Sequence, residues 1–164
     1  QLCKEMEAIG IDVFEQPLSA NDLQGHAKLR AFTTIPIALD ESVWTPEDVI
    51  RAIQMDACDT IVIKVTKMGG LSKAMECGMI AKAAGKDLLG GGLTESTLAL
   101  YGSAHLFHAL DIKTPVDLNG LMFLKDDPSK EIAMIKAGEV EIPVQPGIGW
   151  EVDTKKLEQY SIDM

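Results

Sequence analysis

Three residues of types that bind divalent cations or move protons recur at nearly equal spacing along the chain. Glu15, Asp40 and Lys64 each follow a short apolar run, and they are 25 and 24 positions apart. Two carboxylates that meet at one place form a hard-oxygen site, which suits Mg²⁺ or Mn²⁺. A lysine beside a divalent cation is pushed toward its neutral form, and a neutral amine can remove a proton. The pattern predicts a site for metal-assisted proton abstraction, with Glu15 and Asp40 as metal ligands and Lys64 as catalyst.

The elements that must position these residues alternate between strand and helix. Five apolar runs are expected to form strands, at 11–14, 35–39, 60–65, 88–89 and 116–119. Amphipathic or capped stretches are expected to form helices, at 1–10, 21–30, 45–55, 72–84 and 96–110, with Asn21 capping the second. Strands that are continuously apolar indicate a parallel sheet covered by helices, so the predicted fold class is α/β.

Polar residues gather where these strands end, and this distinguishes two kinds of parallel fold. Every expected strand has a titratable residue at or just beyond its carboxyl end: Glu15, Asp40, Lys64, Glu95 and Asp117. An open doubly wound sheet binds ligands near one switch point, whereas a TIM-type barrel builds its active site from all strand ends. The sequence therefore predicts part of a (β/α) barrel.

The length fits only part of such a barrel. A complete barrel takes about 250 residues, whereas this chain has 164 and begins at Gln1 rather than Met. About three strand–helix units are therefore expected to be missing upstream. We expect residues 1–120 to form a partial barrel, and residues 121–164, rich in Pro and Gly near 143–149, to form a C-terminal segment that closes it.

The composition excludes several classes of partner. Asp and Glu number 25 against 15 Lys and Arg, for a net charge of -10, which disfavours nucleic acid and anionic membranes. No apolar run approaches the roughly 20 residues that span a bilayer, and no signal peptide is recognisable. Cys3, Cys58 and Cys77 are odd in number and lack CxxC spacing, so we expect reduced core thiols in a cytoplasmic protein.

Four motifs together carry a family resemblance. They are Phe14-Glu15-Gln16-Pro17, Ala38-Leu39-Asp40-Glu41-Ser42, the run from Ile63 to Gly70, and Gly91-Gly92-Leu93-Thr94-Glu95-Ser96. With the closing Pro146–Gly149 turn, the chain from about residue 10 to its end resembles the C-terminal barrel domain of the muconate lactonizing enzyme subgroup of the enolase superfamily. The resemblance implies the C-terminal part of a (β/α)7β TIM-type barrel with parallel strands.

The same resemblance implies roles for individual residues. Glu15 and Asp40 correspond to the second and third Mg²⁺ ligands, Lys64 to the acid/base on one face of the substrate, and Glu95 to an acid near the substrate carboxylate. The implied reaction removes the α-proton of a small carboxylate substrate through a metal-stabilised enediolate. The family's Lys-x-Lys catalyst, first Asp ligand and N-terminal capping domain are absent here. We therefore expect no turnover by this chain alone, and either a homo-oligomer or pairing with the missing N-terminal part.

Several residues near the site admit two interpretations. Lys67 is expected to be either a solvated charge in a turn or a support for a ligand. Glu41 points away from the barrel interior by strand alternation, unless it bonds to Lys64. Glu95 either contacts substrate or is an acid at a helix N-terminus. The glycines before it, Gly90-Gly91-Gly92, are expected to allow close approach and to need unusual backbone angles.

The substrate is expected to be recognised at Asp117 and Asn119. Members of the subgroup that epimerise dipeptides or other amino-acid derivatives carry an acidic pair at this spacing, where Asn119 now replaces the second acid. We favour racemisation or epimerisation of such a derivative. Muconate-type cycloisomerisation is second, and dehydration of a hydroxy acid is third. A non-catalytic alternative is a half-barrel that associates through unpaired strand edges.

The remaining polar residues are three histidines and a charged run near residue 126. His26 is open to either a structural or a chemical role, whereas His105 and His108 lie too far along a helix from the strand ends to act there. Lys125-Asp126-Asp127 is expected to be a solvated cluster of charges in a turn.

Overall fold

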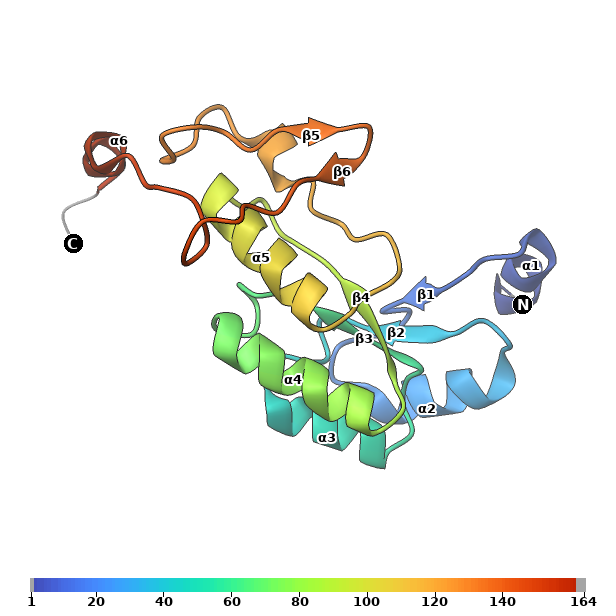
Figure 1. The fold of residues 1–164 in the computed structure, drawn as a ribbon. Helices are drawn as coiled ribbons and strands as arrows, with labels where there is room; N and C mark the ends of the chain where they lie inside the picture. The colour runs from blue at the N-terminus through green and yellow to red at the C-terminus, as the bar shows by residue number, and fades with distance from the viewer. Residues whose placement is uncertain (1, 162–164) are drawn as a thin grey trace.

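A parallel sheet of four strands forms the centre of the computed structural model, which describes residues 2–161 (Figure 1). The strands are β1 (Phe14–Glu15), β2 (Ile37–Leu39), β3 (Thr60–Ile63) and β4 (Asp87–Gly90). They lie in sequence order, and each neighbouring pair is parallel. The α/β class and the parallel sheet are thus confirmed.

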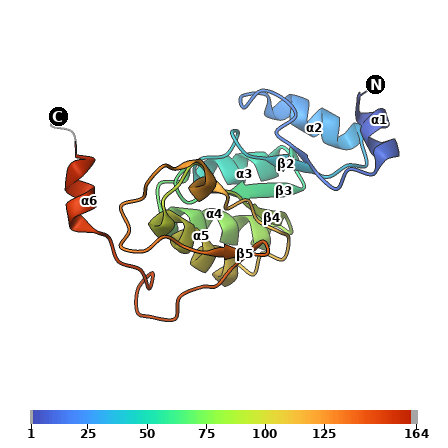
Figure 2. The same cartoon turned by 90° about the horizontal axis from the view of Figure 1, so that it is seen from above.

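Helices α2 (Leu23–Phe32), α3 (Pro46–Gln54) and α4 (Leu71–Ala83) connect successive strands, and together with α5 (Thr97–Ala109), which follows β4, they cover one face of the sheet. Helix α1 (Leu2–Ile9) precedes β1 and lies apart from this layer (Figure 1). The C-terminal segment holds the 3-10 helix η1 (Gly120–Phe123), the antiparallel hairpin β5 (Ile135–Lys136) and β6 (Glu139–Val140), and helix α6 (Thr154–Gln159). Helices α1 and α6 lie at opposite ends of the molecule, as Figures 1 and 2 both show.

Alternation along the strands separates a helix-covered face from a face that bears the polar residues. Leu39, Ile61 and Ile63 are fully buried, in a core that includes residues of α3 and α4. Because successive side chains of a strand point to opposite faces, Val62 and Lys64 share the other face. Both of them line a pocket there. The chemistry-bearing side chains therefore lie on the side of the sheet away from the helices.

Local start signals explain where two of the helices begin. The Thr45 side chain accepts from the N–H of Asp48 while the Asp48 carboxylate accepts from the N–H of Thr45, a capping box before Pro46. Helix α2 is capped by Asp22, whose Oδ1 accepts from the N–H of Gly25 at 2.8 Å. The prediction of Asn21 as its cap was wrong by one position.

The strand expected at 116–119 is also wrong. The N–H of Asp117 donates to the carbonyl of Gly90 at 3.0 Å, as a fifth strand would, but residues 116–119 form no strand. Pro115 has no N–H to extend the ladder, and Asn119 already leads into η1. This stretch follows the edge of β4 without joining the sheet as a strand.

The three cysteines are free and buried, which confirms the expectation of core thiols. Burial raises the pKa of the Cys58 and Cys77 thiols to about 11. Within residues 2–161, none of the helices has both the length and the apolar character needed to cross a membrane.

One acid of the Lys125–Asp127 run departs from the expected solvated cluster. Asp126 is exposed and accepts from Lys156 and Tyr160. Asp127 is only 1% exposed, and its carboxylate accepts from the backbone N–H groups of Thr97 and Ser129. The prediction was wrong for Asp127 because its partner at Thr97 lies 30 residues away in the sequence.

Candidate active site

The structure brings together the residues expected at the strand ends. Lys64 Nζ donates to Asp40 Oδ2 at 2.6 Å, which joins the ends of β2 and β3. Glu15 and Lys64 line one pocket of about 280 Å³ together with Asp117. The pocket wall also contains Val62 and Leu89, from the inner positions of β3 and β4. Carboxylates and an amine thus share one cup at the carboxyl edge of the sheet.

Asp40 is the buried centre of this group. It is 2% exposed, and its two carboxylate oxygens are bound by two different ammonium groups. Oδ2 accepts from Lys64, and Oδ1 accepts from Lys67 at 2.7 Å. Burial favours the neutral carboxyl, but the hydrogen bonds and charges of Lys64 and Lys67 outweigh it and hold the pKa of Asp40 below its usual value. The two ammonium groups therefore stabilise the charged form of Asp40.

Lys67 is a buried part of the cluster rather than a solvated turn residue. Its side chain is 4% exposed, and its Nζ also donates to the carbonyls of Asp40 at 2.7 Å and Val62 at 3.2 Å. These carbonyls lie where the hydrogen-bond ladder between β2 and β3 ends. Of the two interpretations, the structure rules out the solvated one and favours support of Asp40. Burial lowers the pKa of Lys67 despite its bonds to Asp40.

Burial and neighbouring charges together set the pKa values of Lys64 and Glu15. Burial alone would lower the pKa of Lys64, but the Asp40 hydrogen bond and the charges of Asp40, Glu15 and Glu41 raise it above its usual value. Desolvation and the charge of Asp40 raise the pKa of Glu15. Glu15 and Asp40 thus repel each other, and a cation between them would relieve that repulsion.

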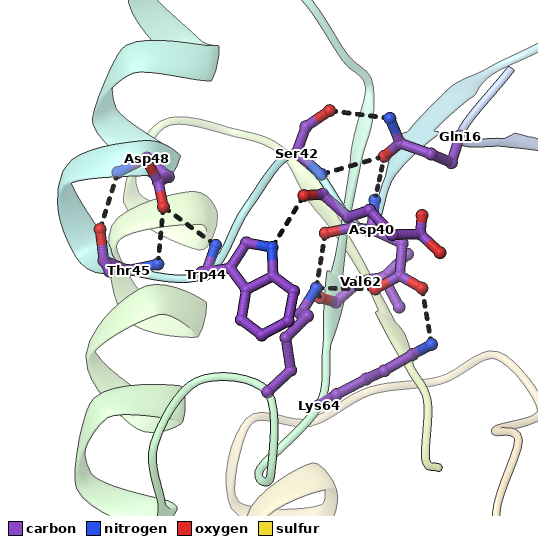
Figure 3. Close-up of polar contacts among 10 residues, drawn as sticks. Gln16, Asp40, Ser42, Trp44, Thr45, Asp48, Val62 and Lys64 are labelled. Atoms are coloured by element: carbon purple, nitrogen blue, oxygen red, sulfur yellow. Dashed lines mark hydrogen bonds and ion pairs between the residues drawn. The ribbon is translucent and has the colours of Figure 1, made fainter. Parts of the chain in front are cut away.

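Gln16 is a site residue to which the sequence assigned no role. Its Oε1 accepts from the N–H of Asp40 at 2.8 Å and of Ser42 at 3.2 Å, and its Nε2 donates to Ser42 Oγ at 2.8 Å (Figure 3). Its own φ is 39°, in the left-handed region that favours glycine. The end of β1 thus holds the backbone on both sides of Glu41. The sequence signal for this contact was that the motifs Glu15-Gln16-Pro17 and Asp40-Glu41-Ser42 follow neighbouring strands.

We expect Gln16→Ala to destabilise the protein by about 1–3 kcal/mol, because two partly buried backbone N–H groups lose their acceptor. Urea unfolding followed by circular dichroism measures the change. Gln24 is exposed on α2 and makes a matched control, for which we expect less than about 0.5 kcal/mol. Equal effects of the two substitutions would show that the Gln16 bonds add no stability.

Glu95 lies beyond the end of β4 and is 7% exposed. The Thr66 hydroxyl donates to Glu95 Oε1, and burial raises the pKa of the Glu95 carboxyl. The preceding glycines allow close approach: a Cβ on Gly91 would lie 2.7 Å from Lys64 Cε. The expectation of unusual backbone angles was wrong, since none of Gly90, Gly91 and Gly92 has positive φ.

The structure separates the other two expected site residues from the cluster. Glu41 is exposed; its carbonyl accepts from Trp44 Nε1 at 2.8 Å, and its charge contributes to the raised pKa of Lys64. Asn119 is exposed and lines a neighbouring pocket of about 470 Å³ that it shares with Asp117. Only Asp117 of this pair reaches both pockets.

Two of the three histidines, His26 and His105, have structural partners. His26 is fully buried; its Nδ1 lies 2.7 Å from the Asp22 carbonyl, and its Nε2 lies 3.3 Å from the N–H of Leu18. The backbone N–H of Leu18 can only donate, so Nε2 must be the acceptor of that bond. We therefore assign the ring proton to Nδ1, which donates it to the Asp22 carbonyl. His105 Nε2 lies 3.2 Å from the carbonyl of Ile148. Both rings therefore hold loops in place.

The carboxylates fit part of a site for a divalent cation. Across residues 2–161, no three His, Cys, Asp or Glu side chains are grouped as a complete metal site. Glu15 and Asp40 supply two hard oxygen donors whose mutual repulsion a cation would offset. Their chemistry suits Mg²⁺ or Mn²⁺ if further ligands come from outside this chain.

Comparison with known proteins finds similar chains that are more than twice as long. The chain is 33% identical over 147 residues to the L-Ala-D/L-Glu epimerase of Clostridium acetobutylicum, covering 90% of this chain and 41% of that protein. It is 32% identical over 157 residues to muconate cycloisomerase 1 of Acinetobacter baylyi, covering 95% and 42%. The chain therefore spans less than half the length of these relatives.

Solved structures and a family profile agree with these relatives. The muconate lactonizing enzyme from Klebsiella pneumoniae superimposes with a TM-score of 0.90 and 32% identity, over 98% of this chain and 46% of that one. The sequence profile described as enolase C-terminal domain-like matches residues 1–156. With a match over nearly its whole length and a parallel α/β structure, the chain belongs to the enolase C-terminal domain-like family.

Proposed function

We propose that the chain is the C-terminal part of an isomerase that removes and returns the α-proton of a small carboxylate substrate. The observation that carries this proposal is the pocket shared by Glu15, Lys64 and Asp117, with Lys64 bonded to the buried Asp40. Relatives named as an epimerase, a racemase and cycloisomerases support the reaction class.

In the proposed site, Lys64 moves the proton at the substrate α-carbon. Its Nζ is the amine of the pocket, and Asp40 orients it. Glu95, buried and beside the glycine run, contacts the substrate carboxylate. Asp117 faces the same pocket and would pair with a cationic nitrogen of the substrate. We therefore favour racemisation or epimerisation of an amino-acid derivative or dipeptide.

Glu15 and Asp40 would hold Mg²⁺ or Mn²⁺ in this proposal. The cation supplies Lewis-acid stabilisation of the negative charge that develops on the substrate carboxylate. Catalysis on the opposite face of the substrate needs a second proton carrier, which the expected upstream part would provide. We propose that residues 1–120 are part of a (β/α)7β barrel and that residues 121–164 close it. We also propose that the enzyme works in the cytoplasm, where thiols such as the three free cysteines stay reduced.

The proposal is tested by exchange of the substrate α-hydrogen with deuterated water. Acids, N-acylated amino acids and dipeptides are incubated with Mg²⁺ and the longer polypeptide that contains residues 1–164, and deuterium uptake is followed by NMR. We expect uptake at the α-carbon of one substrate class. Absence of exchange across all classes, in a folded polypeptide that binds Mg²⁺, would contradict the proposal.

Muconate-type cycloisomerisation is the second candidate. It is favoured by the similarity to muconate cycloisomerases and by Asn119, which replaces an acid that would bind an ammonium group. Asp117→Asn distinguishes the two reactions. It should raise the KM for an ammonium-bearing substrate and leave muconate turnover unchanged.

For the isolated chain, the alternative is association without catalysis. Strand β1 is the last strand on one side of the sheet, and an unpaired strand edge is a template for pairing with another chain. Size-exclusion chromatography of residues 1–164 separates the outcomes. A stable monomer would contradict association.

A further inference from the structure

A buried carboxylate of the C-terminal segment caps the helix that follows Glu95. Asp127 Oδ2 accepts from the N–H of Thr97 at 2.5 Å. Thr97 is the first residue of α5, and the N–H groups of a first helical turn have no partner within the helix. Ser96, at the usual capping position, makes no such side-chain bond. Asp127 therefore performs this function from 30 residues further along the chain.

Further contacts tie the same segment to the start of α5. Asp127 Oδ1 accepts from the N–H of Ser129 at 2.8 Å, and the N–H of Ala133 donates to Thr97 Oγ1 at 3.1 Å. Asp127 and Thr97 are almost completely shielded from water. A carboxylate is favoured at a helix N-terminus by the helix dipole. Residues 127–133 thus hold the first turn of α5 by backbone and side-chain bonds.

The loop held in this way carries Glu95. Glu95 lies two residues before Thr97. Two further parts of the chain, at Gly120 and at Thr66, also contact it or its loop. A Cβ on Gly120 would lie 2.4 Å from the Glu95 nitrogen and 2.5 Å from the Leu93 oxygen, so the backbone at the start of η1, where the C-terminal segment begins, packs directly on this loop. The Thr66 hydroxyl donates to Glu95 Oε1 from the turn after β3. Glu95 is therefore fixed between that turn and the C-terminal segment.

We propose that Asp127 is a positioning residue for Glu95. By holding the start of α5 against the C-terminal segment, it sets where the Glu95 carboxylate lies at the edge of the candidate active site. The inference rests on the proposed function only for the substrate contact assigned to Glu95. The link between Asp127 and Glu95 is a property of the folded chain and needs no turnover.

The test follows the Glu95 carboxyl carbon by NMR in residues 1–164 labelled with ¹³C-carboxyl glutamate. Glu95→Gln identifies its signal. We expect Asp127→Ala to move that signal to the position of exposed glutamates, and to speed hydrogen exchange at the Thr97 amide by about tenfold or more. Asp127→Asn keeps one acceptor oxygen and should give a smaller shift. Asp126→Asn, on the exposed neighbour, should leave the Glu95 signal in place.

Two results would overturn the proposal. One is an unchanged Glu95 signal in folded Asp127→Ala. The other is an equal shift in Asp126→Asn, which would show general loosening of the C-terminal segment. If circular dichroism shows that Asp127→Ala is unfolded, Asp127→Asn decides by the same criteria. Because no readout involves activity, failure here is distinct from failure of the exchange assay.

Discussion

Lys64→Met should lower the rate of α-hydrogen exchange in the longer polypeptide by about 10²–10⁴-fold, the usual contribution of a positioned acid or base. The loss should be confined to the substrate enantiomer whose α-hydrogen faces Lys64. The reason is that Lys64 is the amine of the pocket that also contains Glu15 and Asp117. Deuterium uptake, measured separately for each enantiomer by NMR, gives the result.

The fold should survive this substitution, because Asp40 keeps Lys67 as a partner at Oδ1. Lys73→Met is the matched control: Lys73 is exposed and pairs only with Glu76 at the surface among the contacts of the described residues. It should leave exchange unchanged. If Lys64→Met exchanged the α-hydrogen of both enantiomers at rates within tenfold of the unsubstituted protein, Lys64 would not be the residue that moves the proton.

Asp40→Ala should destabilise the chain by about 3–5 kcal/mol, because removing one partner of a buried ion pair leaves an uncompensated charge. Two ammonium groups depend on Asp40: that of Lys67, whose side chain is 4% exposed, and that of Lys64, at 14%. Urea unfolding of residues 1–164, followed by circular dichroism, measures the loss.

Glu76→Ala provides the comparison for a surface pair. Glu76 bonds to Lys73 at 2.9 Å, with both side chains at least half exposed, and such pairs contribute about 0–1 kcal/mol. If Asp40→Ala cost no more than Glu76→Ala, the cluster of Asp40, Lys64 and Lys67 would not be the structural centre of the site.

Parallel topology explains why much of the site could be predicted. Carboxyl ends of successive parallel strands lie at one edge, so Glu15, Asp40 and Lys64 had to approach one another once their strands were identified. In the structure, period-2 alternation also places Val62 beside Lys64 on the face that lines the pocket. The five-strand count failed at 116–119, where Pro115 and η1 limit pairing to a single ladder-like bond from Asp117.

The parts that could not be predicted depend on contacts between distant segments. Lys67 is buried because it binds carbonyls of two strands, and Gln16 matters because its side chain reaches the backbone beyond β2. Asp127 reads as a surface acid beside Asp126, yet its partner is the first amide of α5. Local pattern fixes which elements form, whereas burial of a polar residue follows from what folds against it.

Binding of Mn²⁺ to the chain itself tests most directly whether these residues form one cation and proton-transfer site. Small amounts of Mn²⁺ are added to residues 1–164, and the NMR signals of the glutamate and aspartate carboxyl carbons and the lysine Nζ are followed. We predict that the Glu15, Asp40 and Lys64 signals broaden first and together, and that Glu15→Gln weakens this broadening. Broadening that begins at surface acids such as Glu139 and Glu141, while Glu15 and Asp40 stay sharp, would contradict the shared site.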